Sequence, residues 1–198
     1  MKLGTIIIFN ATKGGWFSSA QRFFTRMPFT HVGGYIGTVV NEESIFEALE
    51  AVAITPWSRR KYDETMQYYV YEPNDSMITS DATKKALNEL YNAHAGNVYG
   101  FFQLLWFVYR WIGESWPFKA DMRKFRNWFP GGSICSEVWY DYLTRLGRIY
   151  PEIEKVLSEW PHANTVHAGD MYDIMQALCI KGYYKLVQLN NVIKVPIK

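Results

Sequence analysis

The chain has few cysteines and little excess of charge. Its 198 residues include two cysteines, Cys135 and Cys179, which are too few for a disulfide framework. The 21 lysines and arginines nearly balance the 19 aspartates and glutamates, so the net charge of +2 does not favour nucleic-acid binding. Hydrophobic residues make up 48% and charged residues 20%, a composition that predicts a folded domain.

Motifs for cofactors and metals are also missing. The chain has no phosphate-binding glycine loop with a lysine and no dinucleotide fingerprint. Its histidines, cysteines and carboxylates do not recur at the spacing of a zinc site. We therefore predict neither a metal nor a cofactor. The absence of an internal repeat, together with the length, predicts a single domain over residues 1–198.

No apolar segment is long enough to span a membrane. The most apolar stretch, residues 98–112, falls short of the ~20 residues that a span requires and contains Gln103 and Arg110. The apolar residues 3–9 are not followed by a small-residue cleavage site, so we interpret them as a strand rather than a signal peptide. Without a signal peptide or a membrane span, we expect a cytoplasmic location, bacterial or viral, or carriage in a particle.

Aromatic residues are abundant at 17% and gather in residues 101–130, which we predict to be a helical insertion. Within it, residues 117–129 carry an apolar stripe beside lysines and arginines, a pattern typical of a basic amphipathic helix. Such a helix can lie on a membrane surface. It can equally be a surface helix whose basic side faces water.

The remaining pattern predicts strands and helices in alternation. We expect strands at residues 29–37, 44–49, 66–71, 185–189 and 191–197, and helices at residues 18–26, 81–94 and 151–160. Residues 57–61 have the composition of a solvated loop. His94 falls on the apolar face of its helix, where a hydrogen-bonded core histidine is more common than a catalytic one.

Cys135 stands at the expected start of a helix. Apolar residues at 135, 138, 139, 142, 143 and 146 follow helical spacing, and Gly147 is the predicted C-cap. Free N–H groups and the helix dipole favour a thiolate at such a position. Cys135 is therefore either an activated thiol or a small buried apolar residue.

Two further residues have the chemistry that a thiol nucleophile requires. His31 alternates with Gly33 and Tyr35 along one strand. Glu47 lies on the apolar face of the next strand, where a carboxylate needs a partner. A histidine that takes the thiol proton and a carboxylate that orients the histidine complete a triad. Glu50 is a competing acid, but it has the opposite strand parity.

Four short motifs resemble a known family. They are Thr30-His31-Val32-Gly33-Gly34-Tyr35, Ile45-Phe46-Glu47-Ala48, Gly96-Asn97-Val98-Tyr99 and Cys135-Ser136-Glu137-Val138. Their order is similar to that of the circularly permuted papain-like superfamily of NlpC type, particularly the YiiX-like and lecithin:retinol acyltransferase-like proteins. Two departures are the long separation between His31 and Glu47 and the large insertion before Cys135.

The resemblance implies an α+β fold in which a small antiparallel sheet packs on the helix that carries Cys135. It also implies a cysteine peptidase, amidase or acyltransferase with Cys135, His31 and Glu47 as a triad. The oxyanion or substrate-site candidates are Tyr99, Tyr35 and Ser136. The expected substrate is a peptide or cell-wall amide, or a lipid-like acyl group. The alternative is a catalytically silent binding or assembly module that uses residues 101–130 as its interface.

Overall fold

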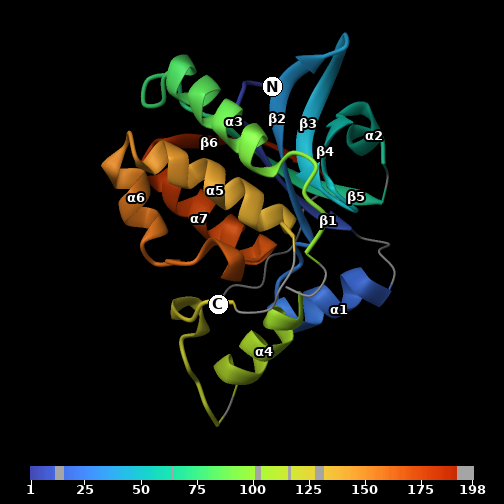
Figure 1. The fold of residues 1–198 in the computed structure, drawn as a ribbon, viewed down its shortest axis with the longest axis vertical. Coiled ribbons are helices and arrows are strands. Elements are labelled where there is room, and N and C mark those ends of the chain that lie inside the picture. The colour runs from blue at the N-terminus through green and yellow to red at the C-terminus, as the bar shows by residue number, and fades with distance from the viewer. Residues whose placement is uncertain (12–15, 64, 101–103, 116, 128–131, 191–198) are drawn as a thin grey trace.

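The computed structural model describes residues 1–11, 16–63, 65–100, 104–115, 117–127 and 132–190. A six-stranded antiparallel sheet with the order β4-β3-β2-β1-β5-β6 forms its centre (Figure 1). The strands are β1 (Ile6–Ala11), β2 (His31–Val39), β3 (Glu42–Ala48), β4 (Val52–Pro56), β5 (Met66–Pro73) and β6 (Tyr184–Asn190).

The larger helices cover one face of this sheet, and two others lie beyond one end of it (Figure 1). The helices are α1 (Trp16–Thr25), α2 (Ser58–Lys61), α3 (Ser80–His94), α4 (Leu104–Glu114), α5 (Cys135–Gly147), α6 (Pro151–Leu157) and α7 (Ala168–Ile180). Helices α5 and α7 pack directly on β2, and α1 contacts α4 away from the centre of the sheet. Short 3₁₀ turns occur at Met122–Lys124 and Ala163–Thr165.

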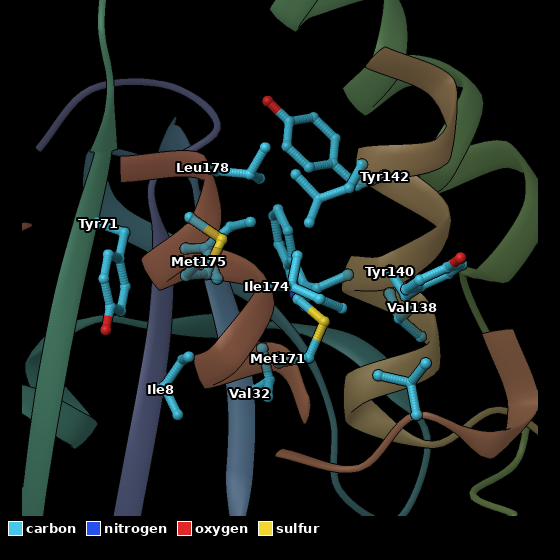
Figure 2. Close-up of a cluster of buried hydrophobic side chains, with 14 of the residues drawn as sticks. Ile8, Val32, Tyr71, Val138, Tyr140, Tyr142, Met171, Ile174, Met175 and Leu178 are labelled. Carbon is cyan, nitrogen blue, oxygen red and sulfur yellow. The ribbon is translucent and has the colours of Figure 1, made fainter. Parts of the chain in front are cut away.

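The main core lies between the sheet and the helix pair α5 and α7. Figure 2 shows apolar side chains of the two helices meeting each other and the side chains of the strands. Trp139 of α5 is fully buried there, and its Nε1 donates to the Phe46 carbonyl oxygen of β3 at 2.9 Å. Gly34 of β2 permits this packing, because a Cβ at that position would lie 2.3 Å from the Trp139 ring.

A long hairpin explains the separation between His31 and Glu47. Strands β2 and β3 are joined by a two-residue turn in which Val40 and Asn41 have φ angles of 50° and 64°. Positive φ at both positions is typical of the turn that joins twisted antiparallel strands. Gly33 lies directly opposite Glu47, so the two-residue alternation of a strand places His31 and Glu47 on the same face.

The structure confirms the mixed α and β composition and most of the predicted elements. The strands predicted at residues 3–9, 29–37, 44–49, 66–71 and 185–189 are present with shifted bounds, and so are the helices at 18–26, 81–94 and 151–160. The sheet is larger than expected, because β4 was not predicted. The strand predicted at 191–197 lies outside the described residues.

Three local predictions are wrong. The described part of residues 117–129 contains the 3₁₀ turn Met122–Lys124 rather than a basic amphipathic helix, since Lys119 has a φ of 47° and interrupts helical geometry. Part of the loop predicted at 57–61 forms α2. Gly147 is the last residue of α5 and Arg148 is the C-cap. The absence of a side chain at Gly147 instead lets the backbone of Glu154 approach closely.

We predict that Gly34→Ala destabilises the fold, whereas Gly33→Ala does not. The Gly34 Cβ would overlap the buried Trp139 ring, and overpacking of this kind costs about 1–3 kcal/mol. At Gly33 the nearest atom to a new Cβ is the Phe9 ring at 3.4 Å, an ordinary contact distance. Urea unfolding of both variants measures the difference, and equal stabilities would contradict the packing described for Trp139.

Candidate active site

His31 and Glu47 form a buried hydrogen-bonded pair. The distance between His31 Nε2 and Glu47 Oε2 is 2.7 Å. The Glu47 side chain has no exposed surface and the His31 side chain is 11% exposed. His31 is the first residue of β2, so its imidazole lies at the end of the strand while Glu47 comes from the neighbouring strand. The carboxylate thus fixes the orientation of the imidazole.

Arg60 completes this pair, although its position in the sequence had suggested a solvated residue. Its Nε donates to Glu47 Oε1 and its Nη2 to Glu47 Oε2, each at 3.2 Å. Burial acts to raise the pKa of Glu47, but hydrogen bonds and charge interactions with His31 and Arg60 lower it to about 2. Glu47 is therefore an anion held between two cationic groups. A buried carboxylate has two oxygens, and a single histidine leaves one of them without a partner. This was the sequence signal for a second cation.

Cys135 lies at the other side of the imidazole. It is 3% exposed at the N-terminus of α5, and its side chain is hydrogen-bonded to His31. Because His31 Nε2 binds Glu47, the Nδ1 atom is the ring nitrogen left for the sulfur. Backbone N–H groups of Val32 and Ser136 also donate to the sulfur. The helix therefore presents the thiol where its dipole favours the thiolate.

The pKa values of the two groups shift in opposite directions. Burial acts to raise the pKa of Cys135, but the charge of His31, its hydrogen bond and the two N–H groups lower it below the ordinary thiol value. Burial acts to lower the pKa of His31, but interactions with Cys135 and Glu47 raise it to about 9. Between these two pKa values the pair exists as thiolate and imidazolium, and its titration belongs to the pair as a unit.

Tyr99 also contacts the sulfur. Burial, the charge of Cys135 and a hydrogen bond with the Cys135 side chain raise the pKa of Tyr99 well above 10, so the phenol keeps its proton. The backbone N–H of Tyr99 donates to the Glu50 carbonyl oxygen at 3.1 Å. Glu50 is exposed and supports the site through its backbone. The acid that reaches His31 is Glu47.

Two of the other predicted site residues have different positions. The Ser136 hydroxyl donates to the Val166 carbonyl oxygen at 2.6 Å, so Ser136 faces the sulfur through its backbone N–H group. Tyr35 lies opposite Ile45 in the sheet. It is four residues along β2 from His31, a distance of roughly 13 Å at the rise of a strand. The structure therefore does not bring Tyr35 to Cys135.

A second histidine supports the segment that leads into α5. His94 Nδ1 is 3.0 Å from Ser133 Oγ, and His94 Nε2 is 3.0 Å from Asp141 Oδ2. These contacts agree with its prediction as a hydrogen-bonded core histidine. Arg145 Nη2 also donates to Asp141 Oδ2, at 2.7 Å. Since Ser133 is two residues before Cys135, His94 helps to fix the position of the helix start.

We predict that Glu47→Gln lowers stability at neutral pH by about 3 kcal/mol or more, because it leaves Arg60 and His31 without their buried counter-charge. The difference in the free energy of unfolding between the wild type and Glu47→Gln narrows as pH falls from 4.5 towards 2. The unfolded carboxyl takes up a proton near 4.5, whereas the folded one stays ionised to about 2, a difference of up to about 3 kcal/mol.

Urea unfolding between pH 2 and pH 7 tests this dependence. Glu42→Gln, at an exposed position at the start of the same strand, is the matched control and should follow the wild type. If the difference in unfolding free energy between the wild type and Glu47→Gln stays constant over this range, Glu47 is not held as a buried anion.

Comparison with known proteins identifies the fold. No protein-family model and no curated protein sequence matches the chain. The crystal structure of the metalloprotein YiiX from Escherichia coli O157:H7 matches with a TM-score of 0.52 and 17% sequence identity. The match covers 93% of this chain and 96% of that chain. The chain thus has a YiiX-like fold over nearly its whole length.

Proposed function

We propose that the protein is a thiol hydrolase or acyltransferase of the permuted papain-like, NlpC-type group, acting on an amide or ester. The observation that carries the proposal is the position of His31, which is hydrogen-bonded both to the Cys135 side chain and to Glu47. The chain order of histidine, acid and cysteine and the YiiX-like fold support this assignment.

The first half of the proposed reaction forms a thioester. The Cys135 thiolate attacks the substrate carbonyl carbon, and the electron pair of the C=O bond moves to the oxygen. The Cys135 backbone N–H and the Tyr99 hydroxyl are the donors for this oxyanion. When the oxyanion collapses, the bond to the amine or alcohol breaks and His31 gives its proton to that leaving group. The acyl group then remains on the sulfur.

The second half regenerates the thiolate. His31, now neutral, accepts a proton from a water molecule or an acyl acceptor as its oxygen or nitrogen attacks the thioester carbonyl. The C–S bond breaks, the acyl group leaves with the attacking atom, and the sulfur recovers its electron pair. Glu47 keeps its charge throughout and stabilises the imidazolium. Arg60 maintains that charge and touches no reacting atom, so it acts as a positioning residue.

A metal does not fit the donors of this site. YiiX is described as a metalloprotein. In the part of this chain that the structure describes, no three histidine, cysteine, aspartate or glutamate side chains are arranged so that they could hold a metal ion. The Nε2 atom of His31 and both oxygens of Glu47 already have partners within the triad and Arg60. The proposed reaction therefore uses the side chains of the chain itself.

Alkylation by iodoacetamide tests the activation of Cys135. At pH 6 an ordinary thiol of pKa about 8.5 is under about 1% thiolate, whereas a thiol whose pKa is lowered by an imidazolium carries a larger thiolate fraction. We expect Cys135 to be modified at least tenfold faster than Cys179, whose pKa is raised by burial. His31→Ala should abolish this difference. Peptide mass spectrometry measures both sites in one sample.

Cys179 is the internal control for the reagent, and because it is more exposed than Cys135, faster labelling of Cys135 cannot come from access. Modification of Cys135 only with a midpoint near pH 8.5, or at the rate of Cys179, would favour the catalytically silent module over the enzyme. Circular dichroism of His31→Ala shows whether a changed rate reflects lost chemistry or lost fold. Cys135→Ser keeps the volume of the site and should show no labelling at that position.

Acyl transfer is tested with 4-nitrophenyl butyrate as the probe. We expect a butyryl group on Cys135 in the intact mass of the wild type and none in Cys135→Ala. With His31→Gln the acyl-enzyme should persist longer, because no base activates the water that resolves it. Butyrylation that persists in Cys135→Ala would assign the nucleophile elsewhere.

A further inference from the structure

We propose that α1, α4 and residues 117–127 form a surface that docks on an anionic lipid bilayer beside Cys135. We call these residues the apolar–basic lobe. Figure 1 shows α1 and α4 together beyond the end of the sheet, away from α3 and α6. In the described part of the chain, no helix has the length and apolar content to cross a bilayer, so the lobe would lie on the surface.

Helix α4 is apolar on both its buried and its exposed sides. Trp106, Phe107 and Arg110 face the interior. Leu105, Tyr109 and Ile112 are between 44% and 49% exposed, and their spacing of four and three residues places them on one stripe. An ordinary surface helix has a polar outer side, so this second apolar stripe indicates a contact with an apolar phase.

Neighbouring segments extend the apolar stripe. Phe23 of α1 is 62% exposed and its ring lies 5.6 Å from that of Trp111. Phe118 and Phe125, on the segment that follows α4, are 69% and 50% exposed. Large aromatic side chains that are this exposed match the residues by which peripheral proteins enter the boundary of a bilayer.

The charge of the lobe identifies the occupant. Residues 16–26 and 104–127 carry seven of the 21 lysines and arginines, of which Arg110 alone is buried, but two of the 19 aspartates and glutamates. The rest of the chain therefore holds 14 cationic and 17 anionic side chains. A second copy that docked lobe to lobe would oppose like charges, and a nucleic-acid phosphate backbone would leave the phenylalanines in water. An anionic bilayer matches both properties.

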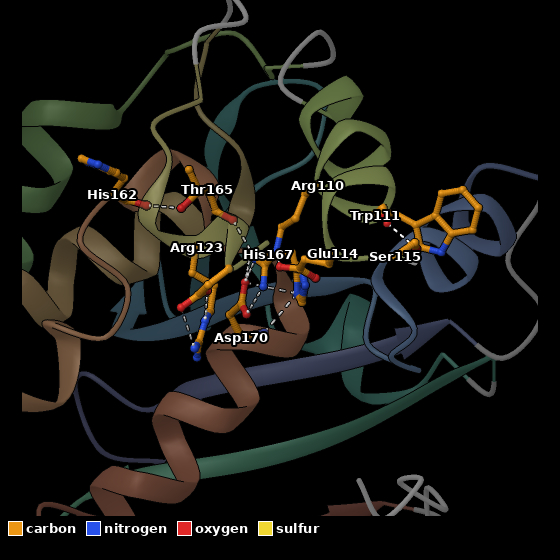
Figure 3. A network of polar contacts seen from close by, with 10 residues as sticks. Arg110, Trp111, Glu114, Ser115, Arg123, His162, Thr165, His167 and Asp170 are labelled. Atoms are coloured by element: carbon orange, nitrogen blue, oxygen red, sulfur yellow. Dashed lines mark hydrogen bonds and ion pairs between the residues drawn. The ribbon is translucent and has the colours of Figure 1, made fainter. Parts of the chain in front are cut away.

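Buried contacts join the lobe to the elements around the candidate active site. Arg110 of α4 forms a buried ion pair with Asp170 at the start of α7, with Nη2 and Oδ1 3.0 Å apart (Figure 3). Arg110 Nη1 also donates to the Thr165 carbonyl oxygen at 3.1 Å. The described lobe residues Trp106, Phe107 and Met122 pack with Ile134, which directly precedes Cys135. The buried side of the lobe therefore packs on the segment that leads into Cys135, while its exposed side can contact the bilayer.

Vesicle flotation with the full chain tests the proposal. The probe is a vesicle of phosphatidylcholine with phosphatidylserine, compared with phosphatidylcholine alone. We expect binding to the anionic vesicle that weakens as salt rises. Two double variants should each lower the partition coefficient at least tenfold: Phe118→Ser/Phe125→Ser and Lys119→Glu/Arg126→Glu. The charge variant has this effect because each exposed cation near the surface raises the partition coefficient about fivefold.

Matched controls lie on the rest of the molecule. Val40→Ser/Ile180→Ser changes two more exposed apolar residues, and Lys84→Glu/Lys85→Glu changes two exposed cations of α3. Both controls should bind as the wild type does. The proposal is overturned if the chain does not bind vesicles, or binds them regardless of lipid. It is also overturned if the control variants lose as much binding as the lobe variants. Normal binding of the phenylalanine variants would overturn it too, because it would indicate a general polyanion site.

The docking proposal does not depend on catalysis by Cys135. The Cys135→Ala variant should bind vesicles as the wild type does. Loss of vesicle binding with normal iodoacetamide labelling would reject the docking surface and leave the proposed enzyme. Normal vesicle binding with an inert Cys135 would reject the enzyme and leave the docking surface.

Discussion

The site depends on a chain of charges that runs from Arg60 through Glu47 and His31 to Cys135. A buried imidazolium alone would be costly, since burial favours the neutral ring. Glu47 offsets that cost on one side, and the thiolate offsets it on the other. Arg60 in turn keeps Glu47 ionised. Each member is stabilised by its neighbours, so the ionised state of the sulfur is a property of the whole chain of charges.

The fold supplies this arrangement from separate parts of the sequence. The long β2–β3 hairpin places His31 and Glu47 on one face, and α5 brings Cys135 to the end of β2. Gly34 lets Trp139 pack tightly on the hairpin, which fixes the height of α5 over the sheet. A β-bridge between Tyr99 and Ser133 joins the segment that leads to the insertion with the segment that leads into Cys135.

The proximity of His31, Glu47 and Cys135 could be predicted because each residue has a local signature. His31 and Glu47 follow strand parity, and Cys135 precedes a helical stripe. Arg60 could not be predicted in the same way, because its own segment has no periodicity that would indicate where its side chain lies. The prediction of a helix at residues 117–129 is wrong because an apolar stripe does not reveal a residue with positive φ, such as Lys119. The Arg110–Asp170 pair joins residues 60 apart, which no local pattern reports.

The most direct test of the central claim is the titration of the His31 imidazole, followed by NMR in the wild type and in Cys135→Ala. The account predicts that wild-type His31 keeps its proton through pH 8 and loses it near pH 9. The pKa should fall in Cys135→Ala, because the negative sulfur no longer stabilises the cation. Titration of His31 near pH 6.5 in both proteins would contradict the thiolate–imidazolium pair.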